Sequence, residues 1–520
     1  MQSPLVVSAT QLIESGRTEE AEILFKQRLE ENPEDKEVLF QLASMLSSLG
    51  RAQEAVDYYR CILSFAPDEI DVHHALGSLF REHGNHEAAL ACFRHAHELG
   101  DASLQLHRNM GDALLDNGDP AGALLSYQHA LALKPHSAPT LGLIGEAHRA
   151  LNQNVEAIAA YRQALEIDPA FTHVQWALAF ALLLMGDYAT GLPLNEKRFN
   201  FESREFLAAL GIWPNIEKFS SKPSWDGGDL KGINLLVWTE QGMGDNIMMM
   251  RYLPLLKERG AKSITVVCHD ALLNIVRPLV DQATSQRDPV YLELFDLHCS
   301  SMSLPYLFGT SLETIPRHLP YLKLATAATQ RWEIKMENVD GLKVGIVWAG
   351  NKGMAKDHLR SLDLARLAPL MGIEGVQFVS LQTGDAARQI RETGWPILDW
   401  MQDAPDFSDT AALIANLDLV ISVDTAVAHL AGALGKPVWL LNRFESEWRW
   451  MTEREDSPWY PTMRIFRQPA LHDWTTVVHQ VAAHLEQAVT TGKSKGRKAA
   501  RDHATRSVSG FIKRLWKRER

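Results

Sequence analysis

The chain has 520 residues, 46% of them hydrophobic and 22% charged, with a formal net charge of −12. This composition excludes disorder along the whole chain, and a length of about 150 residues per domain predicts about three domains. Residues 493–520 carry a charge of about +9, which leaves about −21 on the remainder and argues against a nucleic-acid-binding core. No apolar run reaches the roughly 18 residues of a membrane span, the first residues lack a secretory pattern, and the cysteines lack CxxC spacing, so we expect a cytoplasmic protein.

The first third of the chain repeats with a period of 34 residues. The recurring positions are prolines (Pro33, Pro67, Pro135, Pro169), alanines (Ala21, Ala55, Ala89, Ala123, Ala157), aromatics four residues later (Phe25, Tyr59, Phe93, Tyr127, Tyr161) and turn glycines (Gly16, Gly50, Gly84, Gly118, Gly186). A small residue lets two helices approach, and an aromatic residue on the same face fills the gap, so each repeat predicts a helix pair. The pattern resembles the tetratricopeptide repeat, whose arrays offer a concave groove to partners. Since Gly191 and Asn195 replace the alanine and the aromatic, we expect the array to span residues 1–200.

Short apolar runs rich in valine and isoleucine then alternate with helical stretches. Strands are expected at 233–238, 263–268, 343–348, 377–381, 419–423 and 437–441. Apolar strands separated by helices predict parallel sheets that are covered on both faces. The region is long enough for two such sheets, and we expect the boundary between them in the polar stretch at 330–340.

A glycine-containing turn follows the first of these strands. Gly242 and Gly244 precede Asp245 and an expected helix at 247–259, and such glycines let the backbone approach a ligand at a helix N-terminus. The third glycine of a dinucleotide fingerprint is replaced by Ile247 and no Walker lysine follows, so NAD and P-loop sites are disfavoured. Asp245 is either an N-terminal helix cap or a catalytic carboxylate.

A second strand-to-helix turn contains Asp424, Thr425 and Ala426 and leads into an expected helix at 426–434. The N–H groups at such a helix start stabilise an anion, and a diphosphate fits this position. Asp424 and Thr425 are otherwise plain caps, and His429 is otherwise a buried core histidine.

These residues carry a family resemblance. The stretches 240–247 (EQGMGDNI) and 424–431 (DTAVAHLA) resemble glycosyltransferase family nine, the heptosyltransferase-like enzymes. Residues 348–351 (WAGN), 360–361 (RS) and 380–382 (SLQ) resemble a bacterial group in which tetratricopeptide repeats precede such a domain. The resemblance implies an N-terminal all-α tetratricopeptide solenoid followed by an α/β GT-B fold.

In that fold, two Rossmann-like halves face a cleft. The expected halves are an acceptor side at 201–335 and a donor side at 336–490. The resemblance further implies transfer of a hexosyl or heptosyl group from a nucleotide-sugar donor, with inversion and without a metal or other cofactor, the nucleotide-sugar being a substrate. Because a repeat groove of acceptor size is fused to a donor-binding cleft, our leading hypothesis is that the acceptor is a protein bound by the repeats.

The resemblance also assigns roles to single residues. Asp245 matches the family's catalytic base, while Thr425 and Ala426 would hold the donor diphosphate, with Asp424 near the sugar. The further expected donor-site residues are Gly242, Gly244, Asn351, Arg360, Gln382 and His429. Two departures from the family, Thr383 in place of a lysine and Ala426 in place of a glycine, leave the identity of the donor open.

The basic tail at 491–520 is predicted to be a linker up to residue 506 and then a charged segment. Residues 507–520 place four apolar side chains at helical spacing among lysines and arginines. This predicts an amphipathic helix on the inner membrane face, and the alternatives are a solvated charged tail or a docking segment for a partner. Two alternative functions therefore remain open at this point. One is an interaction scaffold with a degenerate transferase domain, and the other is a transferase that acts on a glycolipid or saccharide.

Overall fold

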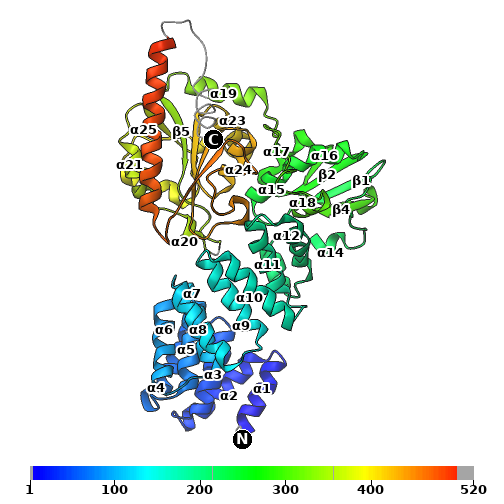
Figure 1. Cartoon of the computed structure of the whole chain (residues 1–520). Helices are drawn as coiled ribbons and strands as arrows, with labels where there is room; N and C mark the ends of the chain where they lie inside the picture. Colours follow the sequence, from blue (N-terminus) through cyan, green and yellow to red (C-terminus); the bar gives the residue numbers. More distant parts are fainter. Residues whose placement is uncertain (1–3, 213–214, 355, 500–520) are drawn as a thin grey trace. The chain divides into compact units, whose positions relative to one another are not determined.

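The structure is a computed structural model that describes residues 4–212, 215–354 and 356–499 (Figure 1). The chain divides into two compact units between Val174 and Gln175. No helix within the described ranges is long and apolar enough to cross a membrane. The segment at 507–520, for which an amphipathic helix was predicted, lies outside the described residues.

The first unit is an array of antiparallel helix pairs that follows the 34-residue period. Its helices are α1 (Pro4–Glu14), α2 (Thr18–Glu31), α3 (Lys36–Ser48), α4 (Ala52–Phe65), α5 (Ile70–Glu82), α6 (His86–Glu98), α7 (Leu104–Asp116), α8 (Pro120–Leu133), α9 (Ala138–Ala150) and α10 (Asn154–Ile167). The recurring alanines and aromatics of the second helix in each pair are fully or almost fully buried. The predicted solenoid is therefore confirmed, with these residues as its core.

Small residues in the first helix of each pair form a class that the sequence analysis missed. An ideal Cβ on Gly77, Gly111 or Gly145 would lie 2.3–2.5 Å from a ring carbon of the aromatic residue in the following helix. The aromatic ring thus packs directly against the backbone of the neighbouring helix, which explains why glycine occupies these positions.

The turn glycines act through their backbone conformation. Gly16, Gly50, Gly84 and Gly118 have φ between +74° and +78°, the left-handed region in which glycine ends a helix without strain. Asn152, which replaces glycine in the next repeat, has φ of 58°, and asparagine is one of the few other residues that tolerate this region.

A further helix pair, α11 (Thr172–Leu184) and α12 (Tyr188–Asn195), leads into the second unit. The division falls inside α11, earlier in the chain than the expected end of the array at residue 200. Asn195, at the position of the aromatic, accepts a hydrogen bond of 3.2 Å from the Trp176 indole N–H, so a polar contact replaces the ring packing of the earlier repeats.

The first sheet of the second unit has four parallel strands in the order β3-β2-β1-β4. The strands are β1 (Asn234–Trp238), β2 (Ser263–Cys268), β3 (Gln282–Ser285) and β4 (Leu297–Ser300), and the neighbouring helices are α13 (Arg204–Ala209), α14 (Asn215–Phe219), α15 (Met243–Met249), α16 (Leu253–Glu258), α17 (Leu273–Val276) and α18 (Leu304–Leu307). The single helix expected at 247–259 is therefore wrong, because α15 and α16 are separated by a 3-10 turn at Met250–Tyr252.

The second sheet has six parallel strands in the order β10-β9-β8-β5-β6-β7. The strands are β5 (Leu342–Val347), β6 (Val376–Ser380), β7 (Leu398–Asp399), β8 (Leu419–Val423), β9 (Val438–Asn442) and β10 (Met463–Arg467), and the helices are α19 (Thr326–Met336), α20 (Asp357–Arg360), α21 (Ala368–Met371), α22 (Gln389–Thr393), α23 (Phe407–Ala415), α24 (Ala426–Ala433) and α25 (Trp474–Ala499). One face packs on α21 and α25 and the other on α23 and α24 (Figure 1).

Two expectations about connecting segments differ from the structure. The polar boundary expected at 330–340 contains most of α19, because Trp332 and Met336 are buried and anchor a helix there. The linker expected from residue 491 is helical up to Ala499, as a continuation of α25.

Strand order locates the ligand-binding edge of each sheet. In the first sheet the order reverses between β1 and β4, and in the second it reverses between β5 and β8. Open parallel sheets bind ligands outside the carboxyl ends of strands at such a reversal. The turns after β1 and β8 are the two motifs singled out in the sequence.

Candidate functional site

The turn after β1 owes its shape to Gln241 more than to its glycines. Gln241 has φ of 59°, and its N–H donates a 2.6 Å hydrogen bond to the Leu210 carbonyl. Gly242 has an ordinary φ of −77° and is the N-cap of α15. Gly242 therefore does not use the conformational freedom of glycine, and its suggested contact with the donor stays a prediction.

Asp245 is a helix cap, which is one of the two roles that the sequence left open, and its catalytic role stays a prediction. Its Oδ2 accepts a 3.1 Å hydrogen bond from the Gly242 N–H, which is a helix-capping contact. Its Oδ1 forms an ion pair with the Arg449 guanidinium, which follows β9 in the second sheet. The Asp245 side chain is 15% exposed, so the carboxylate remains reachable for a substrate.

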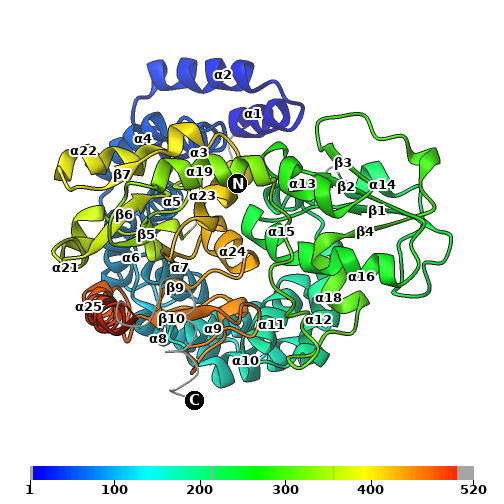
Figure 2. The same cartoon turned by 90° about the horizontal axis from the view of Figure 1, so that it is seen from above.

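Gly244 brings α15 against α24. An ideal Cβ on Gly244 would lie 2.7 Å from His429 Cδ2 and 3.4 Å from the Ala426 Cα. The two helices lie side by side between the sheets in both views (Figures 1 and 2). Glycine at position 244 therefore allows the two helices to pack closely. Asp245 is the next residue in the chain, so it lies beside the contact with the start of α24.

The start of α24 is arranged as an anion site would be. Thr425 is the N-cap with extended backbone, and its hydroxyl lies 3.1 Å from the Ser422 hydroxyl and not on the helix N–H groups. The first N–H groups of a helix have no partner within it, and the helix dipole adds positive potential. Asp424 is 9% exposed, and its backbone carbonyl accepts a 2.9 Å hydrogen bond from Arg360.

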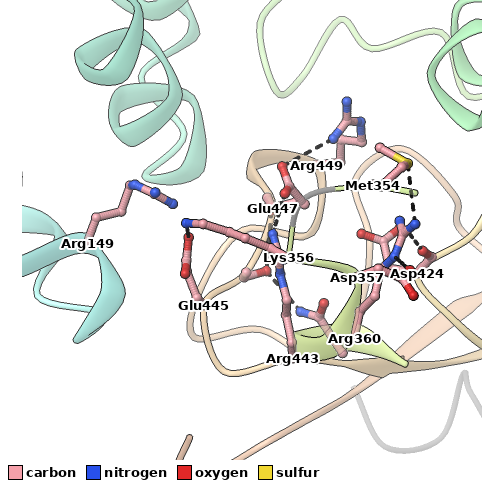
Figure 3. Close-up of polar contacts among 12 residues, drawn as sticks. Arg149, Met354, Lys356, Asp357, Arg360, Asp424, Arg443, Glu445, Glu447 and Arg449 are labelled. Atoms are coloured by element: carbon pink, nitrogen blue, oxygen red, sulfur yellow. Dashed lines mark hydrogen bonds and ion pairs between the residues drawn. The ribbon is translucent and has the colours of Figure 1, made fainter. Parts of the chain in front are cut away.

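Arg360 ties the turn after β8 to the turn after β5 (Figure 3). Besides the Asp424 carbonyl, its guanidinium contacts the Asp357 carboxylate at 2.9 Å and the Met354 sulfur at 3.5 Å. These contacts use all three of its nitrogen atoms. Arg360 therefore lies beside the start of α24 as a structural cation, and its expected contact with the donor stays a prediction.

Gln382 and Asn351 differ in the burial and in the hydrogen bonding of their side-chain amides. Gln382 is buried, with its Oε1 accepting from the N–H groups of Trp348 and Ala349 and its Nε2 donating to the carbonyls of Ala349 and Thr383. Since these bonds saturate the amide, Gln382 shapes the turn after β5. Asn351 is exposed, and its side-chain oxygen accepts a 3.0 Å hydrogen bond from the Gly353 N–H.

His429 is a buried histidine one turn into α24. Its Nδ1 lies 2.9 Å from the Tyr460 hydroxyl, and its ring packs on Trp450 at 5.0 Å between centroids. Burial lowers the pKa of His429 to about 3, and the cations Arg251 and Arg360 add to this effect. The imidazole is therefore neutral near pH 7, as expected of a core residue.

Arg449 is the site residue that the sequence analysis missed. It is 7% exposed, burial lowers its pKa to about 10, and its Nε is buried without a hydrogen-bond partner. Its Nη1 lies 3.5 Å from the Glu447 carboxylate (Figure 3). A signal for it existed, because the segment after β9 leaves the same sheet edge as Asp424.

A buried ion-pair network supports the turn after β1. Arg198, which is fully buried, donates to Glu240 at 2.7 Å, to Glu196 at 2.6 Å and to the Ser303 hydroxyl at 2.9 Å. Glu240 also accepts from Ser300. Because Glu240 precedes Gln241 directly, this network fixes the entry to the turn.

A groove of about 750 Å³ lies in the first unit on helices α3, α5 and α7. Its lining combines the apolar Phe40 and Ile70 with polar side chains. Among these, the His74 Nε2 lies 2.6 Å from Asp101 Oδ2, and Asn109 lies 3.5 Å from the other ring nitrogen. Such a mixture of polar and apolar surface suits a peptide segment. Across the described parts of the chain, no cluster of three or more histidine, cysteine or acidic residues could hold a metal ion.

Comparisons with known proteins agree with both halves of this description. Models of the tetratricopeptide repeat match residues 12–79, 74–138 and 145–186, and the model of glycosyltransferase family 9 (heptosyltransferase) matches residues 405–476. The latter match contains β8, α24 and the segment around Arg449. The fold is thus an all-α tetratricopeptide solenoid followed by an α/β region of the GT-B type with two Rossmann-like halves.

A curated relative, Protein FlbA of Caulobacter vibrioides, is 30% identical over 339 residues, which is 60% of this chain and 54% of that protein. The chain thus spans about half the length of the curated relative that it matches. Similar solved structures include the tetratricopeptide protein YrrB (20% identity, TM-score 0.30, 34% of this chain and 92% of that one) and the protein TTC0263 of Thermus thermophilus (26% identity, TM-score 0.29, 34% and 97%).

Proposed function

Since the chain joins tetratricopeptide repeats to a segment of glycosyltransferase family 9, we propose that it transfers a sugar from a nucleotide-sugar donor to a protein held by the repeats. The observation that carries the proposal is the packing of Gly244 on Ala426, which brings the Asp245 carboxylate and the start of α24 to one place. One group would act on the acceptor and the other on the donor.

The donor diphosphate would lie against the N–H groups at the start of α24. Thr425 and Ala426 supply these groups, and the alanine keeps the N–H that a glycine would offer there. The field of Arg360 favours the same anion. This arrangement stabilises the charge that develops on the leaving nucleoside diphosphate, so the proposed reaction needs no metal ion.

Asp245 would act as the general base in an inverting displacement. Its carboxylate takes the proton of the acceptor hydroxyl while that oxygen forms a bond to the anomeric carbon of the sugar. The bond between this carbon and the phosphate oxygen breaks, and its electron pair leaves with the nucleoside diphosphate. The contact with the Gly242 N–H orients the carboxylate for this step.

The groove on α3, α5 and α7 would hold a segment of the acceptor protein. Repeat arrays bind extended partners on their concave surfaces, and a groove of about 750 Å³ accommodates several side chains. Binding at a distance from the reacting hydroxyl would convert the transfer into an effectively intramolecular reaction.

The experiment is a calorimetric screen of UDP-, GDP-, ADP- and dTDP-linked sugars with the full chain, followed by mass spectrometry of cellular proteins with and without the chain. We expect one donor to bind and protein glycosylation to depend on the chain. If a donor binds but no protein is modified, the acceptor is a glycolipid or saccharide. If no donor binds, the chain is an interaction scaffold without transferase activity.

A further inference from the structure

Arg449 differs from Arg360 in how many of its guanidinium nitrogens have a hydrogen-bond partner. Its Nε is buried without a partner, and its Nη1 reaches Glu447 only at 3.5 Å. Among the described residues, the close contact of the guanidinium is the ion pair with Asp245. By contrast, every nitrogen of the Arg360 guanidinium already has a partner. A planar guanidinium with free N–H groups is the side chain best suited to bind a diphosphate.

The position of Arg449 is fixed beside the start of α24 by two independent contacts. Its partner Asp245 follows Gly244, which packs on Ala426. The next residue, Trp450, packs on the His429 ring one turn into α24. An anion at the N-terminus of α24 would therefore compete with the Asp245 carboxylate for the same guanidinium.

We propose that Arg449 alternates between the two anions: it pairs with Asp245 in the donor-free protein and moves to the donor diphosphate when the donor binds. This inference rests on the proposed function and adds a regulatory consequence to it. An ion pair withdraws basicity from a carboxylate, so Asp245 is a weak base until the donor draws Arg449 away. The base is thus released only when a sugar is in place, and the donor binds before the acceptor.

The test measures binding of UDP, GDP, ADP and dTDP to the full chain by calorimetry, with the best wild-type ligand then titrated into variants. Arg449→Gln should weaken binding about 10- to 100-fold, because charge-assisted hydrogen bonds to the diphosphate are lost. Arg449→Lys keeps the positive charge but lacks the planar guanidinium, so its affinity should fall between those of the wild type and Arg449→Gln. The matched control is Arg454→Gln, which removes an arginine paired with Asp456 in the same segment and should change affinity by less than about twofold.

Competition and simple charge repulsion give different results for Asp245→Asn. When Arg449 is present, both explanations predict that Asp245→Asn binds the nucleoside diphosphate more tightly, and we expect a gain in affinity of about threefold or more. The two explanations differ in the Arg449→Gln background. If Arg449 alternates, the gain disappears in the Arg449→Gln background, because no guanidinium remains to be released. An equal gain in both backgrounds would overturn the inference and leave repulsion alone.

The failures are distinguishable. If no nucleoside diphosphate binds the wild-type chain, the proposed function falls and this inference falls with it. If the wild type binds a nucleoside diphosphate and Arg449→Gln binds it equally well, only the role of Arg449 is wrong. Thermal melts of each variant by circular dichroism confirm that the fold is intact, and Arg449→Lys supplies the same comparison should Arg449→Gln not fold.

Discussion

The carboxylate of Asp245, at the start of α15 beside the first sheet, forms an ion pair with the guanidinium of Arg449, which follows β9 of the second sheet. The two residues are 204 positions apart in the chain. Both are largely buried, so the pair is screened less by solvent than a surface pair. The pair therefore joins the turn after β1 to the segment after β9, and the proposed catalysis depends on this arrangement.

The role of Asp245 as a base can be separated from its role as a cap. Asp245→Asn retains an oxygen acceptor for the Gly242 N–H but leaves the buried Arg449 without its carboxylate partner, so we expect a loss of stability from the broken ion pair together with a loss of transfer of about 100- to 10,000-fold. Asp245→Ala should also lower the free energy of unfolding by about 1 kcal/mol, because the cap is lost. Denaturant unfolding and initial rates check both, and a folded Asp245→Asn variant with near wild-type transfer would remove Asp245 from the mechanism.

The two glycines of the first motif should respond differently to alanine. Gly244→Ala places a methyl group 2.7 Å from the buried His429 ring, so we expect a loss of about 1–3 kcal/mol of stability together with reduced transfer. Gly242→Ala meets only Asp245 Oδ2, at 3.1 Å, and has an ordinary φ, so its effect should be smaller. Thermal unfolding of the two variants compares them directly. Equal losses would contradict the assignment of Gly244 to the contact between α15 and α24.

The buried network below the turn should depend on Arg198. Arg198→Met leaves Glu240 and Glu196 without their partner, and we expect a loss of about 3–5 kcal/mol. Adding Glu240→Gln removes one uncompensated charge and should recover part of that loss. A double-variant cycle by denaturant unfolding measures the coupling, and purely additive losses would show that the pair is not coupled.

The buried His429 should make stability dependent on pH. Its folded-state pKa of about 3 lies below the usual value near 6.5, so the unfolded chain binds a proton that the folded chain excludes between these values. The contribution of neutral His429 is complete above about pH 6.5 and is lost as pH falls, at up to about 1.4 kcal/mol per pH unit. His429→Gln should flatten this part of the curve between about pH 7 and 5. An unchanged slope would assign the effect to other groups.

The sequence predicted the repeat period and the strands at 263–268 and 419–423 with their observed bounds, because a fixed step and a continuous apolar run are local signals. It missed β3, β4, β7 and β10, of which β3 (QATS) and β4 (LHCS) are short and partly polar, and β7 has only two residues. It also assigned Gln382 to the donor, although the amide is saturated by the turn after β5. Which polar atoms remain free depends on tertiary contacts, and these have no local pattern.

Arg449 escaped prediction for a related reason. Its sequence neighbours match none of the motifs used here, and its significance comes from Asp245, a partner in the other half of the α/β region. The topology rule for parallel sheets places Arg449 among the residues at the ligand-binding edge. The same rule does not predict its ion pair with Asp245.

The most direct test of the site is calorimetry of nucleoside diphosphates with Ala426→Pro. Thr425 has extended backbone and Ala426 is the first residue of α24, so proline fits there and removes one N–H without breaking the helix. We predict that the wild-type chain binds one of UDP, GDP, ADP and dTDP, and that Ala426→Pro weakens this binding about tenfold with the melting temperature unchanged. Equal affinity in the two proteins would contradict the placement of the donor diphosphate at the start of α24.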